Sequence, residues 1–147
     1  MGYLDKDTVI ADSAFAVYDA EPWVFGILTS RMHMAWVRVT CGRLETRLRY
    51  SATLCYNTFP LRELTEGEKA RVTEAALGVL DAREAHPEKP AELYDPDRMP
   101  ENLRKAHDRL DAEVDRLYRV KGFKDDGERL ECLFELYREM TQGQQTE

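Results

Sequence analysis

Long apolar runs are missing from this sequence of 147 residues. No run approaches the roughly 18 residues that a helix needs to cross a bilayer, so we expect no membrane partner. A basic and apolar leader with a cleavage site is also missing, and nothing points to secretion. Hydrophobic residues make up 43% of the chain and charged residues 33%, which is typical of a soluble globular protein.

Cysteine and histidine are scarce, with three residues of each. Cys41, Cys55 and Cys132 are widely spaced and odd in number, which argues against a disulfide framework. There is no C-x-x-C pair, and the histidines show no ligand spacing. We therefore expect a location in the reducing cytoplasm and no metal site.

Recognisable catalytic motifs are missing as well. The sequence has no glycine-rich phosphate loop and no nucleophile with a base at a familiar spacing. Residues 56–60 (YNTFP) superficially resemble the Asn-Pro-Pro-aromatic loop of adenine methyltransferases, but the two prolines after Asn57 are absent. We therefore expect no catalytic residue in this chain and a structural role for Asn57.

A strand-like stretch with an unusual charged face is present in residues 42–51. Side chains in a strand alternate between its two faces. One face would carry Leu44, Thr46, Leu48 and Tyr50. The other would carry Arg43, Glu45, Arg47, Arg49 and Ser51. Such a face could form hydrogen bonds to a ligand. Alternatively, it is an ordinary solvated face with cross-strand ion pairs, since surface charges usually need no special explanation.

The net charge of −7 is unevenly distributed. Acidic and basic residues balance in residues 1–60, and residues 61–147 carry the whole net negative charge. The arginines of the first part fall between positions 31 and 49. A local nucleic-acid surface is therefore compatible with the sequence, although the acidic chain as a whole argues mildly against autonomous DNA binding.

The pattern predicts an α+β fold, in which a small mixed α/β part with short strands around a buried helix precedes three helices. Strands are expected in residues 8–18, with a turn or bulge at 12–13, in the charged stretch, and in residues 54–59. The buried helix is expected over residues 23–41, with Pro22 in its first turn and Gly42 at its end.

Helices are expected throughout the second part, residues 61–147. The first begins at a capping box formed by Thr65 and Glu68. The next carries an apolar stripe at helical spacing that includes Leu110 and Leu117, which we expect in the core. Four prolines in residues 86–100 predict an irregular surface loop between these two helices.

Several motifs carry a resemblance that covers nearly the whole chain. The longest are residues 25–37 (FGILTSRMHMAWV) and 49–60 (RYS and LCYNTFP), joined by shorter matches such as 3–8 (YLDKDT), 42–44 (GRL) and 93–95 (LYD). With these motifs the chain resembles the C-terminal region of large bacterial DNA methyltransferases of the MmeI type, which include fused restriction–modification enzymes.

The resemblance implies that the chain is a fragment of a longer enzyme. Residues 1–60 would be the end of a target recognition domain and residues 61–147 a helical C-terminal domain. Such enzymes carry an adenine-N6 methyltransferase domain upstream, which uses S-adenosylmethionine, and some carry a nuclease. The implied partners are double-stranded DNA and that upstream domain. Because the cofactor motifs are absent here, this polypeptide is not expected to methylate DNA alone.

The resemblance also implies which residues read DNA bases. In the MmeI type, a strand with the pattern Glu-x-Arg-x-Arg reads base edges in the major groove, and here that pattern is Glu45, Arg47 and Arg49. A small residue on an earlier strand lies beside the third of these positions, and Ser13 or Ala14 is its nearest equivalent. Glutamate can accept from the cytosine amine and arginine can donate to guanine, so the chemistry agrees.

Candidate contacts to the DNA backbone are Arg31, Arg38 and Arg43. Arg38 and Arg43 also have a simpler explanation, because cations are favoured near a helix C-terminus. An alternative function is a helical protein-interaction module in residues 61–147 with no DNA contact, which the acidic charge favours. Salt-sensitive duplex binding that is lost without Arg47 and Arg49 would distinguish DNA recognition from this alternative.

Overall fold

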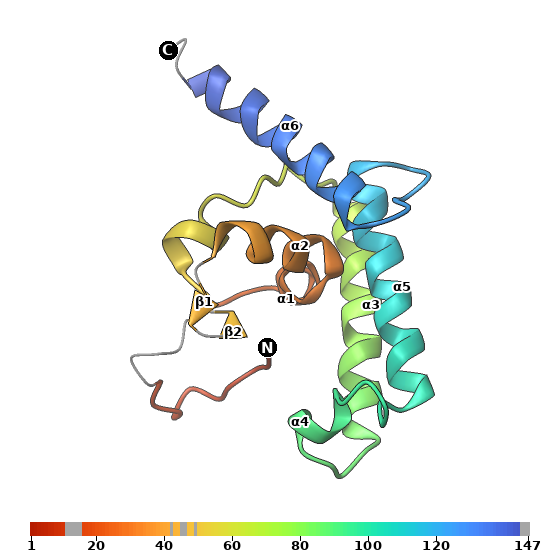
Figure 1. Ribbon diagram of the computed structural model, residues 1–147. Coiled ribbons are helices and arrows are strands. Elements are labelled where there is room, and N and C mark those ends of the chain that lie inside the picture. Colours follow the sequence, from red (N-terminus) through yellow and green to blue (C-terminus); the bar gives the residue numbers. More distant parts are fainter. Residues whose placement is uncertain (11–15, 42, 45–46, 49, 145–147) are drawn as a thin grey trace.

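The computed structural model describes residues 1–10, 16–41, 43–44, 47–48 and 50–144, and residues 43–44 and 47–48 in backbone only (Figure 1). Within these residues the helices are α1 (Pro22–Thr29), α2 (Arg31–Thr40), a π-helical turn η1 (Ala52–Tyr56), α3 (Glu66–Glu84), α4 (Pro90–Leu93), α5 (Glu101–Tyr118) and α6 (Asp126–Gln144). Two short strands, β1 (Arg43–Leu44) and β2 (Arg47–Leu48), lie between α2 and η1. None of the described helices combines the length and the apolar character that crossing a bilayer requires.

The predicted α+β class is wrong, because the described part of the chain is helical apart from one minimal strand pair. β1 and β2 have two residues each and pair antiparallel, with Arg43 opposite Leu48 and Leu44 opposite Arg47. The single strand predicted over the charged stretch of residues 42–51 is therefore wrong, because two segments of that stretch pair with each other. In the predicted first strand, residues 8–10 and 16–18 are irregular, and residues 11–15 lie outside the described residues. A strand needs a pairing partner, and the described residues provide none for this segment.

The strand predicted over residues 54–59 is instead the π-helical turn η1. The side chain of Ser51 caps this turn by accepting from the Leu54 amide, and the Asn57 amide donates to the Ala52 carbonyl at 2.9 Å. Cys55 at its centre is fully buried against Val37 and Cys41. Tertiary contacts with the end of α2 therefore override the strand propensity of this short apolar run.

The single buried helix predicted over residues 23–41 is two helices, α1 and α2, separated at Ser30. Ser30 is fully buried and extended, and its hydroxyl donates to the Ile27 carbonyl at 2.6 Å. The same hydroxyl accepts from the His33 amide at 3.3 Å and so caps α2. The predicted helix end at Gly42 lies outside the described residues; α2 ends at Thr40, with Cys41 as its cap.

The expected amphipathic helices of the second part correspond to α3, α5 and α6. Thr65 and Glu68 form the predicted capping box at the start of α3. Leu110 is fully buried and Leu117 is 5% exposed, so the predicted stripe of α5 is in the core. The irregular loop predicted over residues 86–100 is wrong in part, because it contains α4. Pro90 starts this helix, where the missing N–H of proline costs nothing.

Helices α3 and α5 pack along their length, and α1 lies across them (Figure 1). A side chain at Gly26 of α1 would come within 2.9 Å of Val72 on α3 and 3.2 Å of Leu110 on α5. Glycine therefore permits this close approach of three helices. Met32 and Trp36 of α2 belong to the same buried cluster as these residues. The helix that leads into the strand pair is thus anchored in the main core.

Candidate nucleic-acid interface

The predicted base-reading residues fall on and around the β1–β2 pair. Arg47 is in β2 and Arg43 in β1, where the structure describes their backbone. Glu45, Arg49 and Ser13 lie outside the described residues, as does the alternative Ala14. The geometry of this predicted set is therefore not tested, and its role in reading bases stays a prediction.

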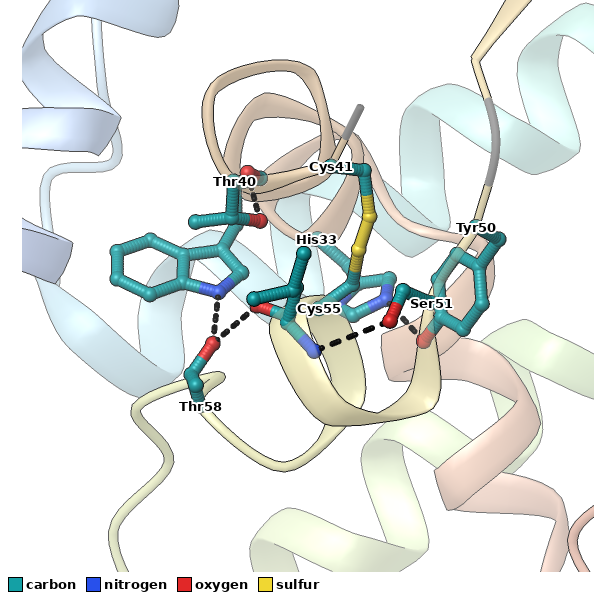
Figure 2. Close-up of a disulfide and its surroundings, with 9 residues drawn as sticks. His33, Thr40, Cys41, Tyr50, Ser51, Cys55 and Thr58 are labelled. Atoms are coloured by element: carbon teal, nitrogen blue, oxygen red, sulfur yellow. Dashed lines mark hydrogen bonds between the residues drawn. A yellow bond between two sulfur atoms is a disulfide. The ribbon is translucent and has the colours of Figure 1, made fainter. Parts of the chain in front are cut away.

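By contrast, the structure describes residues on both sides of the β1–β2 pair. We call Cys41 at the end of α2, together with Tyr50 and η1 after β2, the base of the strand pair. Cys41 caps the end of α2 just before β1, and Cys55 lies in η1 shortly after β2. The two cysteines form a disulfide with a Cα–Cα distance of 6.0 Å (Figure 2). The expectation of no disulfide framework is wrong for this pair. The turn η1 brings Cys55 next to Cys41, and the spacing of the two cysteines in the sequence does not indicate this contact.

A second connection at this base is a hydrogen bond between His33 of α2 and Tyr50, with 2.9 Å between Nε2 and Oη (Figure 2). His33 is fully buried, and the ring of Phe59 packs edge-on against it with 4.7 Å between ring centroids. Burial lowers the pKa of His33 to about 4 and raises the pKa of Tyr50 to about 12. At neutral pH both side chains are therefore uncharged hydrogen-bonding groups.

A third connection joins Trp36 of α2 to the segment after η1. The indole Nε1 donates to Thr58 Oγ1 at 3.1 Å. The same ring lies against Phe134 and Tyr137 of α6, with centroid distances of 5.2 and 5.7 Å. Trp36 therefore links the base of the strand pair to the C-terminal helix.

The predicted backbone contacts Arg31 and Arg38 both lie beside Asp126, the first residue of α6. Arg38 Nη1 is 3.0 Å from Asp126 Oδ2, and Arg31 Nε is 3.8 Å from Asp126 Oδ1. The guanidinium groups stay accessible, since the two side chains are 61% and 52% exposed for Arg31 and Arg38. The Arg31 amide also donates to Asp111 Oδ1 at 2.8 Å at the start of α2. Whether these arginines contact phosphates stays a prediction.

A buried ion pair lies next to Asp126, and no pattern in the sequence predicted it. Arg129 of α6 binds Asp115 of α5 through two hydrogen bonds of 3.0 and 2.7 Å, and it also donates to Asp126 at 3.0 Å. Arg129 and Asp115 are 5% and 6% exposed. Charges on amphipathic helices usually face solvent, so a helical pattern alone gives no signal for a buried pair.

The described residues contain no group of three or more His, Cys, Asp or Glu side chains that could hold a metal ion. Two shallow hollows of about 500 and 370 Å³ are both lined in part by Trp23. The acidic groups around the larger one, such as Glu66 and Glu74, are exposed, and the smaller one is lined mainly by apolar side chains. Neither hollow fits S-adenosylmethionine, which would need several buried polar partners.

Comparison with known proteins supplies the family. Residues 1–63 match the model of the MmeI target recognition domain, and residues 64–144 match that of the MmeI C-terminal domain. The chain is 51% identical over 142 residues to DNA methyltransferase A of Bacillus subtilis (strain 168). This alignment covers 97% of this chain and 16% of that protein.

A similar solved structure is that of the type IIL restriction–modification enzyme MmeI in complex with DNA. The TM-score is 0.80 and the identity 47%, over 84% of this chain and 17% of that chain. The chain therefore spans less than a fifth of the length of either relative.

Proposed function

Because this chain belongs to the MmeI family through both its target recognition part and its C-terminal domain, we propose that it is a sequence-specific DNA-recognition segment of a bacterial adenine-N6 DNA methyltransferase. The observation that carries this proposal is the match to MmeI, a restriction–modification enzyme whose structure was solved in complex with DNA. The fold similarity extends over most of the chain, so the same architecture is available here for holding DNA.

In this proposal Glu45, Arg47 and Arg49 read base edges in the major groove, assisted by Ser13 or Ala14. Glu45 accepts a hydrogen bond from the cytosine N4 amine, and Arg47 donates to O6 and N7 of the paired guanine. This assignment rests on the chemistry of the two side chains and not on their spacing along one strand, because β1 ends at Leu44, β2 begins at Arg47 and the two strands pair antiparallel. The position of Arg47 in β2, on a strand pair fastened to α2 at its base, is consistent with this role.

Arg31, Arg38 and Arg43 would contact phosphates and position the segment without reading sequence. Arg31 and Arg38 are seven residues apart, which puts them on one face of α2. Their shared partner Asp126 would hold both side chains on that face until DNA competes for them.

S-adenosylmethionine and the chemistry of methyl transfer belong, in this proposal, to a methyltransferase domain upstream in the parent enzyme. That domain and double-stranded DNA are the proposed partners, and a cytoplasmic location follows from such a role. The division of this chain into residues 1–60 for DNA recognition and 61–147 for the C-terminal domain is part of the same proposal.

A second candidate is a helical module that binds another protein and does not contact DNA. The observation in its favour is a row of partly exposed apolar side chains along α6, at 44%, 38% and 43% exposure for Phe134, Tyr137 and Met140. Large apolar groups on a surface mark interaction sites when they are contiguous.

Equilibrium binding to a labelled duplex at several salt concentrations separates the two candidates. DNA recognition predicts that the logarithm of the affinity falls linearly with the logarithm of the salt concentration. It also predicts that Arg38→Ala weakens binding to every sequence alike and reduces the salt slope by about one. Lys105→Ala is the matched control, because Lys105 is 74% exposed on α5 and far along the chain from the proposed interface. Absence of duplex binding at low salt would favour the protein-binding candidate.

A further inference from the structure

A hydrogen bond connects His33, a buried polar residue of α2, to Tyr50, which follows the β1–β2 pair. His33 lies in α2 between Met32 and Trp36, which are 0% and 2% exposed and belong to the main core. Its Nε2 atom is 2.9 Å from the hydroxyl of Tyr50, and Figure 2 shows the two side chains pointing toward one another. Tyr50 is two residues beyond Leu48, the last residue of β2.

The strand pair is thereby attached to α2 on both sides. Before β1, Cys41 ends α2 and is joined to Cys55 in η1. After β2, Tyr50 bonds to the middle of the same helix. Of these attachments, the bond between His33 and Tyr50 is the one closest in sequence to Arg47 on the β2 side.

Packing alone does not account for a histidine at this position. The His33 side chain is fully buried, and its Nδ1 atom has no hydrogen-bond partner among the described residues. Burying a polar ring with one nitrogen unpaired costs free energy that an apolar side chain of similar size would avoid. What an apolar side chain cannot supply is the directional bond from Nε2 to Tyr50. That bond is therefore the feature that needs a functional explanation.

We infer that His33 is a positioning residue, which acts through the Tyr50 hydroxyl to orient the strand that carries Arg47 and so sets how strictly base pairs are discriminated. This inference rests on the proposed function of Arg47. Tyr50 follows the end of β2 by two residues, so holding Tyr50 against α2 restricts how far the backbone of β2, to which Arg47 belongs, can shift. A bidentate pair of hydrogen bonds between arginine and guanine requires precise geometry. If the strand is positioned less precisely, this contact is therefore weakened before the contacts to phosphates are.

The test is Tyr50→Phe in the full-length parent enzyme, which deletes the hydroxyl and keeps the ring. Methylation rates are measured on a cognate duplex and on duplexes with one altered base pair. The expected result is a fall of about tenfold in the ratio of the cognate rate to the altered rate, the size of one weakened base contact. The salt dependence of duplex binding should stay that of the wild type, because phosphate contacts are kept.

The chain offers a matched control in Tyr94→Phe. The Tyr94 hydroxyl also bonds to a histidine, at 2.6 Å from Nε2 of His107 on α5, but it lies outside the strand pair and its attachments. This variant should be destabilised without any change in the discrimination ratio. A second pair of variants covers the case in which Tyr50→Phe does not fold. His33→Gln keeps an amide group that can form a hydrogen bond with Tyr50 and should retain discrimination, and His33→Met, which has no such group, should lose it.

The outcomes separate this inference from the proposal beneath it. If folded Tyr50→Phe methylates cognate and altered sites more slowly by the same factor, the positioning role of His33 is overturned and base reading by Arg47 is unaffected. Equal discrimination by His33→Gln and His33→Met would overturn it in the same way. If Arg47→Ala itself leaves the recognised sequence unchanged, Arg47 is not a base reader, and both the proposal and this inference are wrong.

Discussion

Buried polar residues connect separate elements within each part of this chain, and their energetics can be measured one side chain at a time. His33 and the Asp115–Arg129 pair are almost completely inaccessible. Each depends on a specific partner, since a buried polar or charged group left unpaired costs more free energy than a surface group. They therefore give the sharpest predictions at the residue scale.

Protonation of His33 should destabilise the fold. Burial lowers its pKa to about 4 from the ordinary value of 6.5, so between these values the unfolded chain binds a proton that the folded chain does not. The stability from this group is complete above pH 6.5 and is lost as the pH falls toward 4, up to about 3 kcal/mol in total. Denaturant unfolding of wild type and His33→Gln at pH 7 and pH 5 measures it. The wild type should lose about 2 kcal/mol more than the variant; equal losses would mean that His33 is readily protonated in the fold.

Removal of Asp115 should be costly because it leaves Arg129 buried without its main partner. Asp115→Ala is expected to lower the free energy of unfolding by about 3–5 kcal/mol. Arg109→Ala is the control, because the ion pair between Arg109 and Glu74 has side chains that are 58% and 70% exposed. That change should have a much smaller effect on the free energy of unfolding, because an exposed ion pair is screened by solvent. If both variants lower the free energy of unfolding by similar amounts, the Asp115–Arg129 pair contributes no more to stability than an exposed ion pair.

At the scale of single elements, the helices of the second part could be predicted because their signals are local. The capping box at Thr65 and the stripe through Leu110 are both readable within one helical segment, and both are present in the structure. The break at Ser30 had a local signal too, a serine between two apolar runs. The continuous apolar character of residues 23–41 concealed it, because such a run fits one buried helix as well as two.

Strands and the turn η1 could not be predicted in the same way, since they depend on partners distant in sequence. Residues 54–59 have the composition of a strand, but residues 52–56 form a π-helical turn whose Cys55 packs against the end of α2. Alternation of charge in residues 43–49 gives the faces of a strand, yet the described strands are limited to two residues each. The connection of His33 to Tyr50 had no sequence signal, because a tyrosine and a histidine at this spacing are unremarkable.

The disulfide between Cys41 and Cys55 should stabilise the oxidised chain at the element scale. It closes a loop with a sequence separation of 14 residues around the β1–β2 pair. Reduction is expected to lower the free energy of unfolding by about 3 kcal/mol. Denaturant unfolding with and without reductant measures this difference, and Cys132→Ser should leave it unchanged because Cys132 is a free thiol. Three titratable thiols in the protein purified without reductant would contradict the pairing.

At the scale of the whole molecule, the target recognition part and the C-terminal helices form one body. Phe25 and Trp36 from the first part share a buried cluster with Val72, Leu110 and Leu133 from the second. The ion pairs of Arg31 and Arg38 with Asp126 add a polar connection at the edge of that core. The C-terminal helices thus serve as the rigid support on which α2 holds the strand pair (Figure 1).

Methylation-site sequencing of a double charge exchange tests the central claim most directly. If Glu45 and Arg47 read one C·G pair together, Glu45→Lys with Arg47→Asp exchanges donor and acceptor between the two positions. In the full-length enzyme the preference at that position should then invert to G·C by tenfold or more, since one good contact discriminates by roughly 1–3 kcal/mol. Either change alone should weaken methylation, because a like group then faces the base edge. An active double variant that keeps the original recognition sequence at every position would contradict the account.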